Sequence, residues 1–132
     1  MEIEYRVGVI PEVEELIELF IRAGLNRPTS DVARIQRMYA NANLVITAWE
    51  KNKLIGVARS LTDFCFCCYL SDLAVRLDYQ KQGIGKQLIE LTREQIGEQT
   101  SLILLAAPGA INYYPKVGMN KVPNGFMIPR TR

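Results

Sequence analysis

Histidine is absent from the 132 residues of this chain. Its absence excludes serine–histidine–aspartate and cysteine–histidine catalysis, and it excludes the commonest zinc sites. Any catalytic acid or base must therefore be aspartate, glutamate, tyrosine, cysteine, lysine or water. The sequence also lacks an apolar run long enough to span a membrane, and its acidic beginning lacks the apolar core of a signal peptide. We therefore expect a cytoplasmic protein that does not bind a membrane.

Cysteine is scarce as well. The three cysteines, Cys65, Cys67 and Cys68, lie within four residues of one another. They are too few and too crowded for a structural zinc site, which needs four ligands. No histidine or lysine flanks them to lower a thiol pKa, so we expect free thiols packed on a strand and no metal site. On a strand, Cys65 and Cys67 would share one face and Cys68 the other.

Acidic residues are absent after Glu98, whereas basic residues continue to the end of the chain. This basic end suits a ligand that carries several phosphates, although a merely solvated surface explains it equally well. The net charge of +2 and the lack of an arginine–aromatic patch argue against nucleic-acid binding. A hydrophobic content of 48% is ordinary for a globular protein, and the length predicts one domain over residues 1–132.

Hydrophobic periodicity predicts a chain that mixes strands and helices. The predicted strands cover residues 3–9, 44–50, 54–63, 66–75 and 102–106, with edge strands between 119 and 128. The predicted helices begin after Pro11, after Ser30 or Asp31, and at Gly85, and a short one covers residues 110–117. Core stripes are predicted at Val32, Ile35, Tyr39 and Ala42 in the second helix, and at Ile84, Leu88, Leu91 and Gln95 in the third.

The order of these elements predicts the architecture. A strand, a crossover helix and the apolar run 102–106 predict a parallel pair of strands, with 102–106 buried. The polar turn at 51–53 predicts an antiparallel hairpin between the two strands that flank it. The fold class is therefore α/β, with a mixed, mostly antiparallel central sheet and helices on both faces.

The turn before the third helix predicts a phosphate site. Gly83 and Gly85 let the backbone approach a ligand, and the first amides of a helix point together at its positive end. Lys81 and Lys86 add positive charge nearby. We therefore predict that this turn binds a pyrophosphate.

Two common phosphate loops are excluded by counting residues. A P-loop needs glycine where this chain has Gln80, and serine or threonine where it has Gln87. A dinucleotide fingerprint needs a third glycine where this chain has Leu88. What remains is Gln80-x-x-Gly83-x-Gly followed by a helix.

This pattern resembles the acyl-coenzyme A loop of the GCN5-related N-acetyltransferases (the GNAT superfamily), Gln/Arg-x-x-Gly-x-Gly/Ala. The strand residues 71–75 precede it as that family's fourth strand would. Residues 110–119 resemble the family's second signature, Ala-x-x-x-Tyr-x-Lys-x-Gly-Phe. Both signatures stand in family order, so the resemblance covers essentially the whole chain. Leu77, Lys81 and Met119 stand where other residues are common in the family. We expect these differences to affect the affinity for coenzyme A more than whether it binds.

The resemblance implies acetyl-CoA as co-substrate and no metal. It implies that the strands 66–75 and 102–106 splay apart, leaving backbone groups free to pair with the pantetheine arm. The residues assigned to coenzyme A are Leu73, Ala74, Val75, Gln80, Lys81, Gln82, Gly83, Ile84, Gly85, Lys86, Asn112 and Lys116. The reaction it implies is direct attack on the thioester by a primary amine of a small molecule or peptide.

Catalytic roles follow from the same resemblance. Tyr114 matches the family tyrosine that protonates the leaving thiolate, although packing of a short helix or a hydrogen bond to coenzyme A is the alternative. Asp72 is the candidate base, acting through water, and a structural acceptor is an equal alternative. Three glutamates of the first helix either attract a cationic amine or form a solvated face; they are Glu14, Glu15 and Glu18.

Two functions from different classes remain open. The first is an N-acetyltransferase, and the second is a non-catalytic acyl-CoA-binding regulatory module on the same fold. Retention of Tyr114 together with the complete phosphate loop favours the enzyme. Specificity for the acceptor is expected from the segments 25–31 and 63–66 and from the C-terminal strands. A homodimer is possible, because small members of this family are often dimers and apolar strands are expected near the C-terminus.

Overall fold

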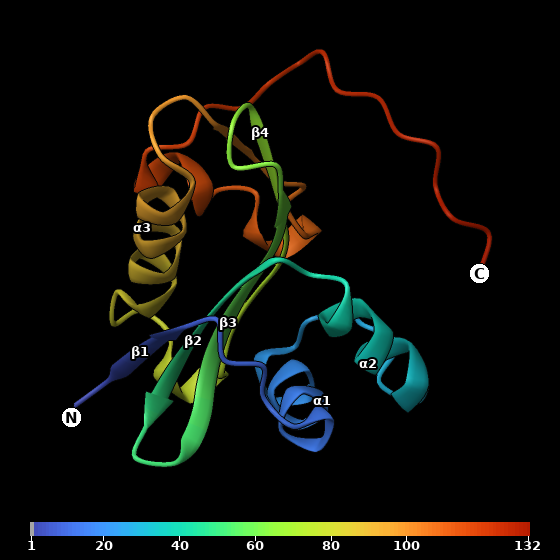
Figure 1. Ribbon diagram of the computed structural model, residues 1–132, viewed down its shortest axis with the longest axis vertical. Helices are drawn as coiled ribbons and strands as arrows, with labels where there is room; N and C mark the ends of the chain where they lie inside the picture. Colours follow the sequence, from blue (N-terminus) through green and yellow to red (C-terminus); the bar gives the residue numbers. More distant parts are fainter. Residues whose placement is uncertain (1) are drawn as a thin grey trace.

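A computed structural model describes residues 2–132 and contains one five-stranded sheet (Figure 1). The strands lie in the order β1-β2-β3-β4-β5, with antiparallel pairs up to β4 and a parallel pair between β4 and β5. Their bounds are β1 Glu4–Val7, β2 Leu44–Glu50, β3 Lys53–Thr62, β4 Cys67–Val75 and β5 Ser101–Ile103. The predicted mixed, mostly antiparallel sheet is confirmed.

Three α-helices and three short 3-10 turns complete the described chain. The helices are α1 Val13–Ala23, α2 Val32–Ala40 and α3 Ile84–Ile96, and the 3-10 turns are Leu77–Tyr79, Pro108–Ala110 and Tyr114–Val117. α3 lies on one face of the sheet, and α1 and α2 lie on the other, as predicted (Figure 1). No helix within residues 2–132 is long and apolar enough to cross a membrane.

Local signals set the ends of the first two helices. Gly24 ends α1 in the left-handed region at a φ of 70°, where glycine carries no Cβ penalty. The Asp31 carboxylate accepts a hydrogen bond from the Arg34 amide at 3.1 Å, so Asp31 caps α2. Within the predicted stripe of α2, Ile35 and Tyr39 are buried, whereas the prediction that Val32 belongs to the core is wrong because this first residue of the helix is exposed.

The third helix packs its apolar stripe on the opposite face. Leu88 and Ile89 are fully buried against the sheet. Thr92 is buried too, and its hydroxyl donates to the Leu88 carbonyl at 2.8 Å, which satisfies its polar atom. The prediction that Gln95 belongs to the core stripe is wrong, since its side chain is exposed and Thr92 and Ile96 fill that face.

A β-bulge in β4 turns one charged residue into the core. Arg59 pairs with Asp72 and Ser60 pairs with Leu70, which leaves Ser71 as an extra residue. Because one added residue changes which face later side chains occupy, Asp72 points to the α2 side of the sheet, where it is completely buried.

The parallel pair is short, and its strands then separate. Pairing runs over three residues and ends at Tyr69 and Ile103, while β4 continues to Val75. The prediction of a buried strand at 102–106 is wrong, because β5 ends at Ile103, Ile103 and Leu105 are exposed, and the residues between and beside them are only partly buried. On the opposite face, Leu102 and Leu104 pack against the core cluster that includes α3.

The C-terminal segment also departs from prediction. Residues 119–132 form no strand, so the expected edge strands between 119 and 128 are wrong for the single chain. Figure 1 shows this segment running away from the sheet. An extended segment forms a strand only when a neighbouring strand edge takes up its backbone hydrogen bonds, and residues 119–132 form no such pairing in the single chain.

The cysteines divide between the hairpin and the core. Cys68 is buried on β4, whereas Cys65 and Cys67 are exposed at the β3–β4 hairpin, so strand packing holds for Cys68 alone. The Asp63 carboxylate accepts hydrogen bonds from three amides of this hairpin, and these bonds lower the pKa of Asp63 to about 2. Within residues 2–132, no cluster of metal-ligating side chains is present.

Candidate functional site

The phosphate turn has the geometry of an anion cradle. α3 begins directly after Gly83, whose φ of 82° lies in the left-handed region that favours a residue without a Cβ. Gln87 is the first residue of this helix whose amide donates a hydrogen bond to a backbone carbonyl, that of Gly83 at 3.0 Å. The amides ahead of it have no carbonyl four residues back within the helix, so they are available at its positive end.

The side chains of the turn separate into two groups. Lys81, Gln82 and Lys86 are exposed, so both ammonium groups are free to approach a phosphate. Gln80 instead donates from its side-chain nitrogen to the Val75 carbonyl at 2.9 Å, which ties the turn to the end of β4. Lys81 has a φ of 65°, in the left-handed region that glycine prefers, which gives a physical reason why glycine suits this position.

Gly85 is in close contact with a tyrosine. A Cβ added at Gly85 would lie 2.7 Å from the hydroxyl oxygen of Tyr113 and 3.9 Å from a methyl group of Val75. The absent side chain therefore makes room for the phenol beside the first turn of α3. Ile84 is buried beneath this turn and anchors it to the core.

A cavity of about 160 Å³ lies where β4 and β5 separate. Leu70, Ser71 and Leu73 line it from β4, and residues 104–107 line it from the chain that follows β5. The loop after α1 adds Leu25 and Arg27, and Tyr114 closes another side. Of the other β4 residues assigned to the cofactor, Ala74 is buried under α1 and Val75 under α3, so only their main chains are candidates for contact.

The two adjacent tyrosines face different parts of the site. Tyr113 packs beside Gly85, whereas Tyr114 lines the cavity. Their rings meet edge to face, with centroids 5.2 Å apart. Burial, and then the neighbouring Tyr113, raise the pKa of Tyr114 above its usual value, and Arg27 opposes the shift. Tyr114 therefore keeps its proton at neutral pH and is able to donate it.

Asp72 is held in an ion network. Its two carboxylate oxygens accept from Arg27 Nε at 2.6 Å, from Arg59 Nε at 2.6 Å and from the Tyr39 hydroxyl at 2.9 Å. Burial alone would raise the pKa of Asp72, but the hydrogen bond and charge of Arg59, followed by those of Arg27, lower it. A carboxylate that is buried, ionised and saturated with donors fits an anchoring role better than that of a general base.

Arg27 is the site residue that sequence reasoning missed. Besides Asp72, its guanidinium donates to the Ser71 carbonyl at 2.7 Å, so it fastens the loop after α1 to the bulge of β4. It lines the cavity together with Tyr114. The available signal was indirect: an aspartate in a buried strand needs a cationic partner, and the segment 25–31 contains one.

Other predicted residues lie outside the cavity. Asn112, just before the Tyr114–Val117 turn, and Lys116, within it, are exposed and do not line the cavity. Glu15 and Glu18 line a separate, open hollow near the β2–β3 hairpin, and Glu14 is exposed. Glu18 also accepts from the Arg76 guanidinium at 3.4 Å, so the structure does not bring these glutamates to Tyr114.

Comparisons with known proteins agree on one family. Residues 19–126 match the model of an acetyltransferase (GNAT) domain. The chain is 31% identical over 68% of its length to "Uncharacterized N-acetyltransferase ycf52" of Pyropia yezoensis, and it spans only 58% of that relative. It is also 36% identical, over 58% of its length and 34% of the relative's, to "Histone acetyltransferase TAP1" of Glycine max.

Solved structures show the same fold. A probable acetyltransferase of unknown function from methicillin-resistant Staphylococcus aureus superposes with a TM-score of 0.81 at 27% identity, covering 96% of this chain and 99% of the other. An aminoglycoside N-acetyltransferase, AAC(6')-Iy, solved with CoA, superposes with a TM-score of 0.73 at 14% identity, covering 99% and 96%. At that identity the likeness concerns the fold alone.

Proposed function

The chain belongs to the GNAT family of acetyltransferases, and we propose that it transfers an acetyl group from acetyl-CoA to a primary amine by direct attack in a ternary complex. One observation carries the proposal. Tyr113 lies beside Gly85 in the first turn of α3, and its neighbour Tyr114 lines the cavity between β4 and β5. The two adjacent tyrosines therefore connect the open amides of α3 with the cavity. A phosphate cradle and a reaction cavity are thereby parts of one site.

The residues present fit coenzyme A. The turn at 82–86 offers main-chain donors at a helix N-terminus, with Lys81 and Lys86 beside it, which suits a pyrophosphate. The unpaired inner edge of β4 beyond Tyr69 suits the amide groups of a pantetheine arm. Asn112 and Lys116 are exposed and do not line the cavity, so any contact they make would be with a part of the cofactor outside it.

Tyr114 is the proposed general acid. Acetyl-CoA supplies the thioester, and the amine nitrogen forms a bond to its carbonyl carbon as the carbon–sulfur bond breaks. Tyr114 donates its proton to the departing sulfur, for which its retained proton and its place in the cavity wall suit it. An amide of β4, among Leu73 to Val75, is the candidate donor to the carbonyl oxygen.

The amine loses its proton to water in this scheme. No carboxylate is among the described residues that line the cavity, and Asp72 is already engaged by three donors. The leucines in the wall and the positive charge of Arg27 both disfavour a charged amine, so they favour the neutral form, which is the nucleophilic form. Asp72 then contributes by holding Arg27, and with it the acceptor side of the cavity, in place.

An amine-panel experiment tests the proposal. Purified protein is incubated with acetyl-CoA and small amines, polyamines, aminoglycosides and amino-terminal peptides, and mass spectrometry detects products that gain one acetyl group. We expect at least one acceptor to be acetylated, with loss of turnover in Tyr114→Phe. Binding of acetyl-CoA without acetylation of any acceptor would instead favour the non-catalytic acyl-CoA-binding module.

A further inference from the structure

The loop between α1 and α2 brings one charge to the cavity. Arg27 is the only charged side chain among the described residues that line it, and the rest of the wall consists of apolar residues, Ser71 and Tyr114. The Arg27 side chain is 23% exposed, so its guanidinium is neither sealed in the core nor fully solvated. A cationic group held in a mainly apolar wall is a candidate binding group for an anion.

The ion network behind Arg27 carries an excess of one positive charge. Arg27 and Arg59 share the single carboxylate of Asp72, and no other carboxylate within residues 2–132 forms an ion pair with either arginine. Arg59 is the inner of the two, since its side chain is 9% exposed and it also donates to the Ser71 hydroxyl. The uncompensated charge therefore lies at Arg27, on the cavity side. Keeping such a charge partly buried is costly, and a neutral donor would have sufficed to fasten the loop.

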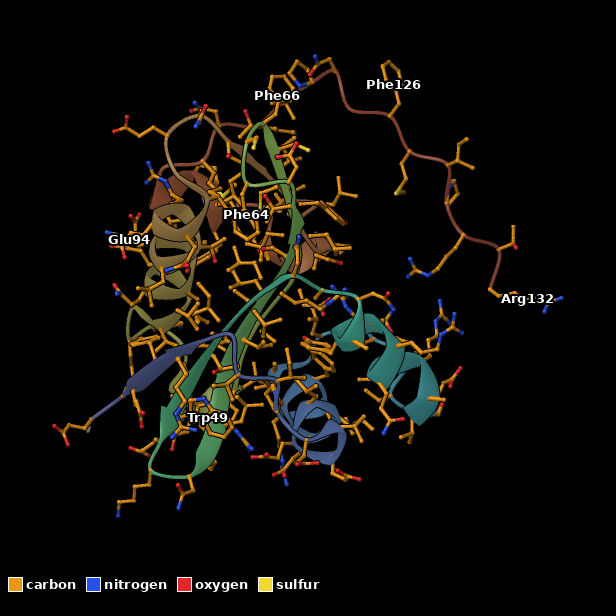
Figure 2. All side chains as sticks on the ribbon, in the orientation of Figure 1. Trp49, Phe64, Phe66, Glu94, Phe126 and Arg132 are labelled. Atoms are coloured by element: carbon orange, nitrogen blue, oxygen red, sulfur yellow. The ribbon has the colours of Figure 1, made fainter. Side chains whose placement is uncertain are left out.

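Other acidic side chains are engaged or face elsewhere. Asp31, in the same loop, caps α2 through the Arg34 amide. Glu18 accepts from Arg76 and lines a hollow separate from the cavity. The acids of α3 lie on the opposite face of the sheet from α1 and α2, as the position of Glu94 shows in Figure 2. The net positive charge at the cavity is therefore left for a ligand.

The Arg27 guanidinium is fixed in place and still has donors to offer. Its Nε donates to Asp72 at 2.6 Å, its Nη1 to the Asn26 carbonyl at 2.7 Å and its Nη2 to the Ser71 carbonyl at 2.7 Å. Each terminal nitrogen of a guanidinium carries two N–H groups, so each keeps one beyond these bonds. Because the side chain is already held, binding a carboxylate costs little further rotamer entropy.

The cavity is small enough to bring a group bound at Arg27 close to Tyr114. At about 30 Å³ per water molecule, its volume of about 160 Å³ equals that of about five waters. Both residues line this one volume. Arg27 also lowers the pKa of Tyr114 against the effect of burial, so its charge acts on the tyrosine. A molecule bound to Arg27 therefore has its neighbouring atoms beside the proposed general acid.

We propose that the acceptor is a small amine that carries a carboxylate a short carbon chain away from its nitrogen, and that Arg27 binds this carboxylate. The inference rests on the proposed acetyl transfer and adds the class of acceptor. Polycationic amines are disfavoured, because they would bring charges of the same sign to Arg27. Selection of the acceptor is then made by charge inside the cavity.

Binding of the carboxylate also assists the amine. In a free amino acid, the carboxylate stabilises the neighbouring ammonium group and raises its pKa. Pairing that carboxylate with Arg27 removes this stabilisation and lowers the pKa of the amine. Since the described lining residues include no carboxylate that could act as a base, a lowered pKa eases loss of the proton to water. Arg27 thus binds the acceptor and raises the fraction of amine in the nucleophilic form.

Matched acceptors test the inference on the wild-type protein. Each set contains an amino acid, its uncharged amide and the amine that lacks the carboxylate: alanine, alaninamide and ethylamine form one set, and phenylalanine, phenylalaninamide and phenethylamine form another. We expect kcat/KM for the acid to exceed that for the amide by roughly 10–100-fold, the value of hydrogen bonds to a charged group. The amide has the more readily deprotonated amine, so amine basicity does not explain a preference for the acid.

Variants of Arg27 test the guanidinium itself. In Arg27→Gln we expect kcat/KM for the acid to fall by roughly 10–100-fold and that for the amide to change by less than about threefold, with the Kd of acetyl-CoA unchanged. Arg27→Lys keeps the charge but loses the planar fork, so it should retain a weaker preference for the acid. Arg37→Gln, an exposed position of α2 outside the cavity wall, is the control and should keep the wild-type preference.

The outcomes separate this inference from the proposed function. Equal turnover of acid and amide by wild type would overturn the carboxylate site. Equal losses for both acceptors in Arg27→Gln would also overturn it, because they are expected if Arg27 only fastens the loop or contacts the thioester carbonyl. Failure to acetylate any acceptor would refute the acetyltransferase, and this inference with it. Urea unfolding checks that Arg27→Gln is folded, and if it is not, the wild-type comparison and Arg27→Lys still decide.

Discussion

Gly85→Ala perturbs the closest contact between the phosphate turn and the tyrosine pair. The new Cβ would lie 2.7 Å from the Tyr113 hydroxyl oxygen, whereas ordinary contact begins at 3.4 Å, so the hydroxyl must retreat by about 0.7 Å. The next ring atom of Tyr113 lies 3.5 Å from that Cβ, which is an ordinary contact. Removing the hydroxyl alone therefore relieves the clash.

The magnitude follows from two opposing effects. Alanine favours a helix over glycine by about 0.5–1 kcal/mol, whereas overpacking costs about 1–3 kcal/mol. We expect Gly85→Ala alone to destabilise the fold by about 1 kcal/mol, and the same change in a Tyr113→Phe background to be neutral or stabilising by about 0.5 kcal/mol. The coupling energy between the two positions is then about 1–2 kcal/mol.

Equilibrium urea unfolding of the four proteins in this cycle measures the coupling, and calorimetry measures the Kd of acetyl-CoA in each. Gly109→Ala is the control, because a Cβ there meets no atom within 4 Å. We expect weaker acetyl-CoA binding by Gly85→Ala and partial recovery in the double variant, since the displaced phenol lies against the turn. Additive effects within about 0.5 kcal/mol would refute the contact between Tyr113 and the turn.

Three further predictions concern charge and backbone strain. Asp72→Asn leaves two partly buried arginines without their counter-ion, so we expect a loss of about 3–5 kcal/mol in urea unfolding, whereas the exposed Asp78→Asn changes it little. Because the pKa of Asp72 is lowered in the folded state, its contribution to stability is fully present above the unfolded pKa of about 4 and is lost as pH falls from there through the folded pKa. A pH series of unfolding midpoints should show this loss in wild type and less of it in Asp72→Asn. Lys81→Gly and Lys51→Gly each relieve a positive φ, so each should raise the unfolding midpoint slightly or leave it unchanged. Only Lys81→Gly should weaken acetyl-CoA binding, and equal acetyl-CoA affinities of the two variants would remove Lys81 from the phosphate site.

Local rules predicted the framework because they depend on near neighbours in sequence. Gly24 and Asp31 mark helix ends through their own backbone and side-chain preferences. The polar turn at 51–53 sets the β2–β3 hairpin by the same kind of rule. The glycine turn before α3 follows from the need for a positive φ at Gly83.

Features that depend on distant contacts were not predicted. Nothing near Ser71 in the sequence marks it as a bulge, yet the bulge decides that Asp72 meets Arg59 and Tyr39 rather than solvent. Arg27 was missed for the same reason, since its partner is 45 residues away. The exposed residues of the 102–106 run and the absence of strands in 119–132 differ from prediction, because an apolar pattern indicates that a segment can form a strand, whereas its pairing and its cover depend on distant residues.

The most direct test is single-turnover acetyl transfer by wild type, Tyr114→Phe and Tyr113→Phe, with an acceptor found in the amine panel, alongside the Kd of acetyl-CoA. If Tyr114 protonates the leaving thiolate, Tyr114→Phe should slow transfer by about 100-fold between roughly pH 7 and 9 while the Kd stays within about twofold. Tyr113→Phe should keep its transfer rate. An unchanged rate in Tyr114→Phe across that pH range would contradict its role as the general acid of an acetyltransferase.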